Sequence, residues 1–166
     1  MSNAGLLSFP LLGTVTDADG NPHPAYHDGA KWNPIGEIQL GYAEINADIV
    51  VPAGPAAPIC SVPVSFAGVG HTCQVLIDIP EIDFTSTSGG ECVVQVTLAG
   101  TTYIIGHVHT DRSVGWPMRS ARRLPIPGAG TYSFDCACDA LSGGVTLHAD
   151  DDVSYGPITA TVTVVG

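Results

Sequence analysis

Apolar and polar residues alternate along most of the chain. The segment ITATVTV at 158–164 shows this most clearly, with aliphatic side chains at even positions and threonines at odd positions. A period of two with one polar face is typical of an antiparallel strand that is buried on one side. The same pattern predicts strands over 37–50, 59–67, 71–79, 91–99, 101–109, 112–125, 130–138, 144–149 and 157–165.

Short glycine-rich segments separate these predicted strands. They lie at 67–70, 88–90, 99–100, 127–130 and 142–144. Many short strands with a turn about every 8–12 residues are typical of two packed antiparallel sheets. We therefore expect an all-β fold, an antiparallel two-sheet sandwich of the jelly-roll type, without a helix of note.

Residues 1–36 differ from the rest of the chain, because they are dense in Gly, Pro, Asp and Asn. The segment GTVTDADGNP at 13–22 is similar to the first strand and turn of carboxypeptidase regulatory-like modules, which predicts a hairpin. We interpret 1–36 as an extended N-terminal arm that attaches the chain to a partner, and 37–166 as the β domain. The apolar residues that would dock the arm are Leu6, Leu7, Phe9, Leu11, Leu12 and Trp32.

The composition narrows the function classes. The 166 residues include 5 Lys and Arg against 16 Asp and Glu, a formal net charge of −11. Because this charge repels phosphate, we expect no nucleic-acid partner. The apolar share of 45% excludes an intrinsically disordered chain. No apolar run is long enough to span a membrane, and Pro10 interrupts the only apolar run near the N-terminus, so we expect neither a membrane partner nor a secretory signal.

The five cysteines lack the spacing of a zinc site. Each shares the parity of the apolar residues of its predicted strand, so we interpret them as small buried hydrophobic side chains. A disulfide between neighbouring core strands remains an alternative under oxidising conditions. The cysteines are Cys60, Cys73, Cys92, Cys136 and Cys138.

Most of the basic residues fall in one segment, which also contains a tryptophan. Arginine beside an aromatic residue is common at protein interfaces, and a row of surface arginines is the simpler interpretation. We treat the segment as a candidate interface or ligand surface. Its residues are Arg112, Trp116, Arg119, Arg122 and Arg123.

The sequence contains only weak signals for metal or catalytic chemistry. His107 and His109 share one strand face and would need a third ligand, such as His71 or His148, to hold a metal ion. Glu81 and Asp83 also share a face, which more often means a solvated surface than a carboxylate pair of a glycosidase. Because no nucleophile elbow, phosphate-binding loop or dinucleotide fingerprint is present, we predict no catalytic residues, no metal and no cofactor.

Two segments carry a resemblance to a known group of proteins. These are GEIQLGYAEI at 36–45 and PGAGTYSF at 127–134, together with the final strand rich in Thr and Val. They resemble small all-β virion proteins of tailed phages that infect actinobacteria, namely minor tail, head-fibre and decoration proteins. The resemblance covers about residues 36–166 and implies a jelly-roll-like fold, often trimeric, that is displayed on the virion without an active site.

We therefore expect a structural virion protein, with other virion proteins and two further copies of itself as partners. The arm would dock on the capsid or tail, and the β domain would be displayed. The alternative is a carbohydrate-binding β-sandwich that attaches to a host surface glycan, with Trp32, Trp116, Tyr26 and Tyr155 as stacking candidates. A third hypothesis is a cupin-like metal enzyme that uses His107 and His109.

Overall fold

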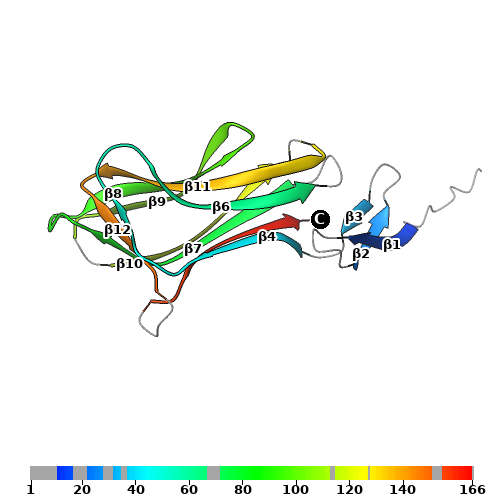
Figure 1. The fold of residues 1–166 in the computed structure, drawn as a ribbon, viewed down its shortest axis with the longest axis horizontal. Coiled ribbons are helices and arrows are strands. Elements are labelled where there is room, and N and C mark those ends of the chain that lie inside the picture. Colours follow the sequence, from blue (N-terminus) through cyan, green and yellow to red (C-terminus); the bar gives the residue numbers. More distant parts are fainter. Residues whose placement is uncertain are drawn as a thin grey trace, which may run out of the picture.

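The structure is a computed structural model, and it describes residues 11–16, 22–27, 32–34, 37–66, 72–112, 115–126, 128–150 and 155–165. The described residues form antiparallel sheets and contain no helix. Two sheets pack face to face as a sandwich, and a small third sheet lies beyond one end of it (Figure 1).

The first sheet of the sandwich has four long strands in the order β4, β13, β7 and β10. Two short strands, β12 and β5, take the place of β13 and β4 beside the second half of β7. The bounds are Glu37–Ile45 for β4, Ile158–Val165 for β13, Thr72–Phe84 for β7, Trp116–Pro125 for β10, Val145–His148 for β12 and Ile49–Val51 for β5.

The second sheet has the order β6, β11, β8 and β9. The bounds are Ala57–Phe66 for β6, Gly130–Ser142 for β11, Gly90–Leu98 for β8 and Thr101–Thr110 for β9. With β5 and β12 left out, the first long strand of the sandwich pairs with the last, the second with the second-last, and so on inward. The pairs are β4–β13, β6–β11, β7–β10 and β8–β9. That nested pairing, with the pairs shared between two sheets, is the jelly-roll topology, so the predicted fold class is confirmed.

The observed strands differ from the predicted ranges in several places: β10 begins at Trp116 instead of residue 112, and β11 continues past residue 138 to Ser142. The range 37–50 is divided by a turn at 46–48 into β4 and β5, and β7 continues through Pro80 to Phe84. Proline normally ends a central strand because it has no N–H for the ladder. Here β7 exchanges β13 for β12 between Asp78 and Glu81, and a bulge interrupts its pairing with β10 at the same place. Pro80 therefore lies where neither neighbouring strand needs its N–H.

The core lies between the inner faces of the two sheets. Its largest fully buried side chains include Phe134 from one sheet and Ile77, Ile79 and Ile82 from the other. The predicted parity of the cysteines is confirmed: Cys73, Cys92, Cys136 and Cys138 are buried, and Cys60 is half-buried. All five are free thiols in this structure.

The two long edges of the sandwich are closed at glycines. A Cβ added to Gly41 in β4 would lie 2.6 Å from Val62 Cγ1 and 2.9 Å from Val64 Cγ2 of β6. At the opposite edge, a Cβ on Gly106 in β9 would lie 2.6 Å from Met118 Sδ of β10. Both distances are too short for a real side chain, so the two sheets meet here because these positions have none.

The edge between β9 and β10 is also held by polar contacts. Ser120 Oγ donates a hydrogen bond to the carbonyl oxygen of Ile105 at 2.6 Å. The guanidinium of Arg122 donates to the carbonyl oxygen of Ile104, and its Cζ lies 5.5 Å from the centroid of the Tyr103 ring. Side chains of one sheet therefore occupy backbone acceptors of the outermost strand of the other, which leaves fewer of them free to pair with another chain.

The N-terminal region contributes the third sheet, whose order is β1, β2 and β3. The bounds are Leu11–Thr16, Pro22–His27 and Trp32–Pro34. In the described residues its strands pair only with one another, and Leu12 in β1 is 74% exposed. Leu11 begins β1 and Trp32 begins β3, opposite His27, whereas Leu6, Leu7 and Phe9 lie outside the described residues.

The glycine contacts lead to a matched pair of substitutions. We expect Gly41→Ala to lower the free energy of unfolding by about 1–3 kcal/mol, because the stiff valines opposite it cannot turn away. Gly106→Ala should lower it by less than about 1 kcal/mol, because the flexible Met118 side chain can move aside. Urea denaturation of both variants measures the difference, and equal losses would contradict this account of the edges.

Candidate functional site

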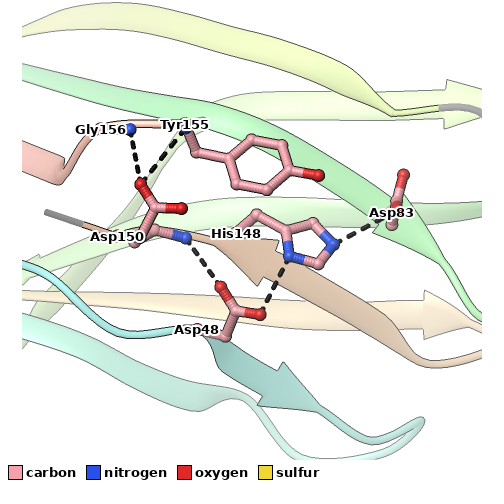
Figure 2. Close-up of polar contacts among 7 residues, drawn as sticks. Asp48, Asp83, His148, Asp150, Tyr155 and Gly156 are labelled. Carbon is pink, nitrogen blue, oxygen red and sulfur yellow. Dashed lines mark hydrogen bonds and ion pairs between the residues drawn. The ribbon is translucent and has the colours of Figure 1, made fainter. Parts of the chain in front are cut away.

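A group of polar side chains surrounds His148 on the outer face of the first sheet. We call His148, Asp48, Asp83, Asp150 and Tyr155 the His148 cluster; Figure 2 shows how they lie. His148 is the last residue of β12, and Asp83 lies on the neighbouring strand β7. Asp48 comes from the turn before β5, and Asp150 and Tyr155 flank the connection from β12 to β13. The cluster thus joins segments from four regions of the chain.

The imidazole of His148 lies between two carboxylates. Nδ1 is 3.0 Å from Asp48 Oδ2, and Nε2 is 3.2 Å from Asp83 Oδ2. A carboxylate only accepts hydrogen bonds, and a neutral imidazole has one N–H to donate. A neutral His148 can therefore donate a hydrogen bond to only one of the two carboxylates, whereas the imidazolium can donate to both.

Asp48 is also held by the backbone. Its Oδ1 accepts a hydrogen bond from the N–H of Ala149 at 2.9 Å. That bond is the largest cause that holds the pKa of Asp48 below its ordinary value; burial opposes it, and the hydrogen bond and charge of His148 add smaller lowering effects. The carboxylate of Asp48 thus fastens the turn before β5 to the end of β12.

The turn after β12 is built around Asp150 and Gly156. Oδ1 of Asp150 accepts hydrogen bonds from the N–H groups of Tyr155 and Gly156, and the Asp150 N–H donates to the Gly156 carbonyl at 3.1 Å. Gly156 has a φ of 80°, in the left-handed region that glycine adopts most easily. This turn brings the ring of Tyr155 onto His148, with 5.0 Å between centroids and 16° between planes.

The surroundings of the cluster are strongly acidic. The negative charge of Glu81 is the largest cause of a raised pKa at Tyr155, followed by burial and by the charges of Asp83, Asp48 and Asp150. Tyr155 therefore stays a neutral phenol. The contacts of His148 and Asp48 join β7, the end of β12 and the turn before β5 to one another.

The structure keeps His107 and His109 on one face of β9 but places His148 on the other sheet. His107 and His109 are exposed on β9, on the outer face of the second sheet, whereas His148 belongs to the first sheet. His107 Nε2 is 2.7 Å from Glu91 Oε1. His71 lies outside the described residues, and among those described no three His, Cys, Asp or Glu side chains are grouped to hold a metal ion.

The structure separates the arginine segment into three places. Arg112 lies in the turn after β9, beside Asp111 at 3.9 Å. Arg122 points to the edge with β9, as described above, and Trp116 begins β10 with 48% of its surface exposed. Arg119 and Arg123 are paired in register with Asp78 and Gln74 of β7, and Arg119 Nε is 3.7 Å from Asp78 Oδ2.

A depression of about 390 Å³ lies at one end of the sandwich. We call this the distal end, because β7, β9 and β11 finish there, whereas β4 begins and β13 finishes at the opposite, proximal end. We name the hollow the distal depression. It is lined by the residues Ser86, Ser88, Gly89, Gly90, His109, Thr110, Asp111, Ser142 and Gly143.

The sequence did not predict the His148 cluster or the distal depression. The sequence pattern indicates a solvated face for Glu81 and Asp83, and it offers His148 only as a third ligand beside His107 and His109. Asp48 and His148 are brought together by the pairing of β12 with β5. The strand pattern shows that β12 exists but not which strands lie beside it.

Comparisons with known proteins give no family for this chain. No protein-family model matches it, and neither does any curated protein. Among solved structures, it is similar to the C-terminal CBM6 of LamC, a marine laminarinase from Zobellia galactanivorans. The sequence identity is 12%, the alignment covers 93% of this chain and 91% of that chain, and the TM-score is 0.32. A likeness at this level says nothing about a ligand. In the part of the chain that the structure describes, no helix has the length and apolar character to cross a membrane.

The lowered pKa of Asp48 predicts a pH-dependent contribution to stability. Because its folded pKa lies below its unfolded value of about 3.9, the contribution is full above that pH and is lost as the pH falls through the folded pKa. We expect Asp48→Asn to lower the free energy of unfolding by at most about 1 kcal/mol at pH 7, discounted because the side chain is 50% exposed.

Urea denaturation at pH 7 and at pH 2.5 tests this expectation. The difference between Asp48→Asn and the parent chain should shrink at pH 2.5. Asp111→Asn is the control, because the Asp111 side chain is 94% exposed and should change little at either pH. An equal loss for Asp48→Asn at both pH values would show that its charge is not the cause.

Proposed function

We propose that this chain is a structural virion protein of a tailed phage, in which the N-terminal segment attaches to the particle and the jelly roll is displayed. The observation that carries this proposal is the placement of two features at opposite ends of the sandwich. The β1–β3 sheet precedes β4, which starts at the proximal end, and the polar turns and their depression lie at the distal end (Figure 1).

The N-terminal sheet supports the attachment role. A sheet of three short strands buries little apolar surface by itself, so it gains stability from a partner surface. Leu12 is exposed on it, and the strands make no ladder with the sandwich among the described residues. We infer that a partner in the particle, either capsid or tail, covers this sheet.

The outer face of the first sheet supports assembly into a homotrimer. One row crosses all four long strands and carries Tyr42, Thr161, Leu76 and Ala121, none of them charged at neutral pH. Tyr42 is partly exposed at the end of this row. A flat, uncharged row on a sheet can pack against copies of itself around a symmetry axis.

Localisation on purified particles tests the proposal. Antibody against the β domain should label intact particles in electron micrographs, and Leu12→Asp should reduce the amount of chain that stays with them. Val50→Asp is the matched control, because Val50 is 68% exposed on β5, away from the N-terminal sheet. Absence of the chain from particles would refute the virion role. Loss with both variants would refute attachment through β1.

The oligomer is tested separately by light scattering after size-exclusion chromatography. We expect the parent chain to have the mass of a trimer and Thr161→Arg to shift it to the monomer, because a buried unpaired charge at an interface is strongly unfavourable. Gln95→Arg places the same side chain on the outer face of the second sheet and should leave the trimer intact. A monomeric parent chain would contradict the trimer.

The distal depression favours a second candidate, a carbohydrate-binding module. Its lining of hydroxyl groups, one imidazole and one carboxylate suits the hydroxyl groups of a sugar, and Trp116 begins β10 at the same end. We expect His109→Ala, which changes the lining, and Trp116→Ala, which removes an exposed ring at the same end, to weaken binding to a host-surface glycan. His107→Ala should leave binding unchanged, because His107 lies outside the depression and is paired with Glu91. Absence of binding in a titration with cell-wall polysaccharide would remove this candidate.

A further inference from the structure

Four of the five cysteines form two neighbouring pairs on the inner face of the second sheet. Cys60 of β6 is directly opposite Cys136 of β11, and Cys92 of β8 is a diagonal neighbour of Cys138 of β11. Cys73 lies in the first sheet, where its thiol donates to the carbonyl oxygen of Leu124 at 3.4 Å. Cys73 is opposite Leu124 and Val164 rather than another cysteine, and burial raises its pKa to about 11.

The pair of Cys60 and Cys136 has the placement that a disulfide needs. The two residues are directly opposite in the ladder between β6 and β11. Opposite residues of antiparallel strands have Cα atoms roughly 4.5–5.5 Å apart, within the range of about 4.4–6.8 Å found for disulfides. Cys136 belongs to the core, and Cys60 is packed against it from the same side of the ladder. A bulge in the ladder next to Cys136 allows local adjustment of β6.

The two thiols of this pair are not equivalent. Cys60 is half-buried, whereas Cys136 is buried. The hydrogen bond between them lowers the pKa of Cys60 and raises that of Cys136. Cys60 is therefore the thiol that ionises first and that a reagent in solution can reach, and Cys136 lies next to it.

We propose that Cys60 and Cys136 are an oxidisable dithiol that closes a cross-strand disulfide by exchange with a low-molecular-weight disulfide, and that Cys92 and Cys138 stay reduced. In the first step the Cys60 thiolate attacks one sulfur of the reagent, which forms a mixed disulfide and releases one thiolate. In the second step Cys136 loses its proton and attacks Sγ of Cys60, which releases the second thiolate. The protein loses two electrons and two protons, and the reagent is reduced to two thiols.

The second pair differs in access and in register. Cys92 is opposite Ala140, and Cys138 is opposite Val94, so the two cysteines are diagonal neighbours. Diagonal neighbours lie roughly 7–8 Å apart, too far for a disulfide without movement of the backbone. Both residues are also fully buried, so a reagent in solution cannot reach either sulfur.

The disulfide would fasten β6 to its neighbour. β6 is the outermost strand of the second sheet, held by the ladder with β11 and by contact with β4. A bond from Cys60 to Cys136 closes a long loop of chain and therefore constrains the unfolded state. We expect the oxidised chain to unfold at a temperature about 10 °C higher than the reduced chain.

The test uses the full chain, purified reduced and exposed to oxidised glutathione at neutral pH. After remaining thiols are alkylated, mass spectrometry of the digest should show a peptide that links Cys60 to Cys136, with Cys73, Cys92 and Cys138 alkylated only when the chain is unfolded first. The melting temperature should rise and should return to its first value with dithiothreitol.

Matched variants separate this proposal from general oxidation. Cys60→Ser should abolish both the linked peptide and the rise in melting temperature, and Cys92→Ala should keep both. A stable glutathione adduct on Cys60 without closure would overturn the proposal. So would a Cys92–Cys138 linkage in the folded chain, or no reaction at any ratio of oxidised to reduced glutathione.

Discussion

The jelly roll depends on the close approach of its two sheets along both long edges. At one edge the backbone of β4 lies against Val62 and Val64, and at the other the backbone of β9 lies against Met118. Sheets in a sandwich are normally about 10 Å apart, and side chains fill the space between them. Gly41 and Gly106 remove the side chain where the strands converge, so the core is sealed at its sides as well as between its faces.

β7 links this closed core to the polar surface. It is paired along its length with β10 on one side, and with β13 and then β12 on the other. The exchange at Pro80 brings in β12, and with it His148, beside Asp83. Because β5 follows β12 in the sheet, Asp48 is brought to the other nitrogen of the same ring. The His148 cluster therefore fastens the two shortest strands of the sandwich, which have few ladder bonds of their own.

Periodicity predicted most of the fold, because one buried face imposes a period of two on each strand. Periodicity was least informative where the pairing partner changes along a strand. The rule that proline ends a central strand predicts that β7 stops at Pro80, but β7 continues because its ladders with β10 and β13 are both interrupted there. The His148 cluster depends on which strands are neighbours. A single aspartate before a short strand, such as Asp48, has no local pattern that distinguishes it from any solvated carboxylate.

The arginine segment shows the converse: residues that are close in the sequence are separated in the structure. Nearness along the chain suggested one basic surface, but alternation along β10 sends Arg122 to the seam with β9 and Arg119 to the outer face of the first sheet. Arg122 therefore stabilises the fold, because its guanidinium donates a hydrogen bond to a backbone carbonyl of the outermost strand β9 and packs on Tyr103. Successive residues of a strand face opposite sides of the sheet. Basic residues that are close in the sequence of a β protein therefore form one surface only where they occupy every second position of the strand.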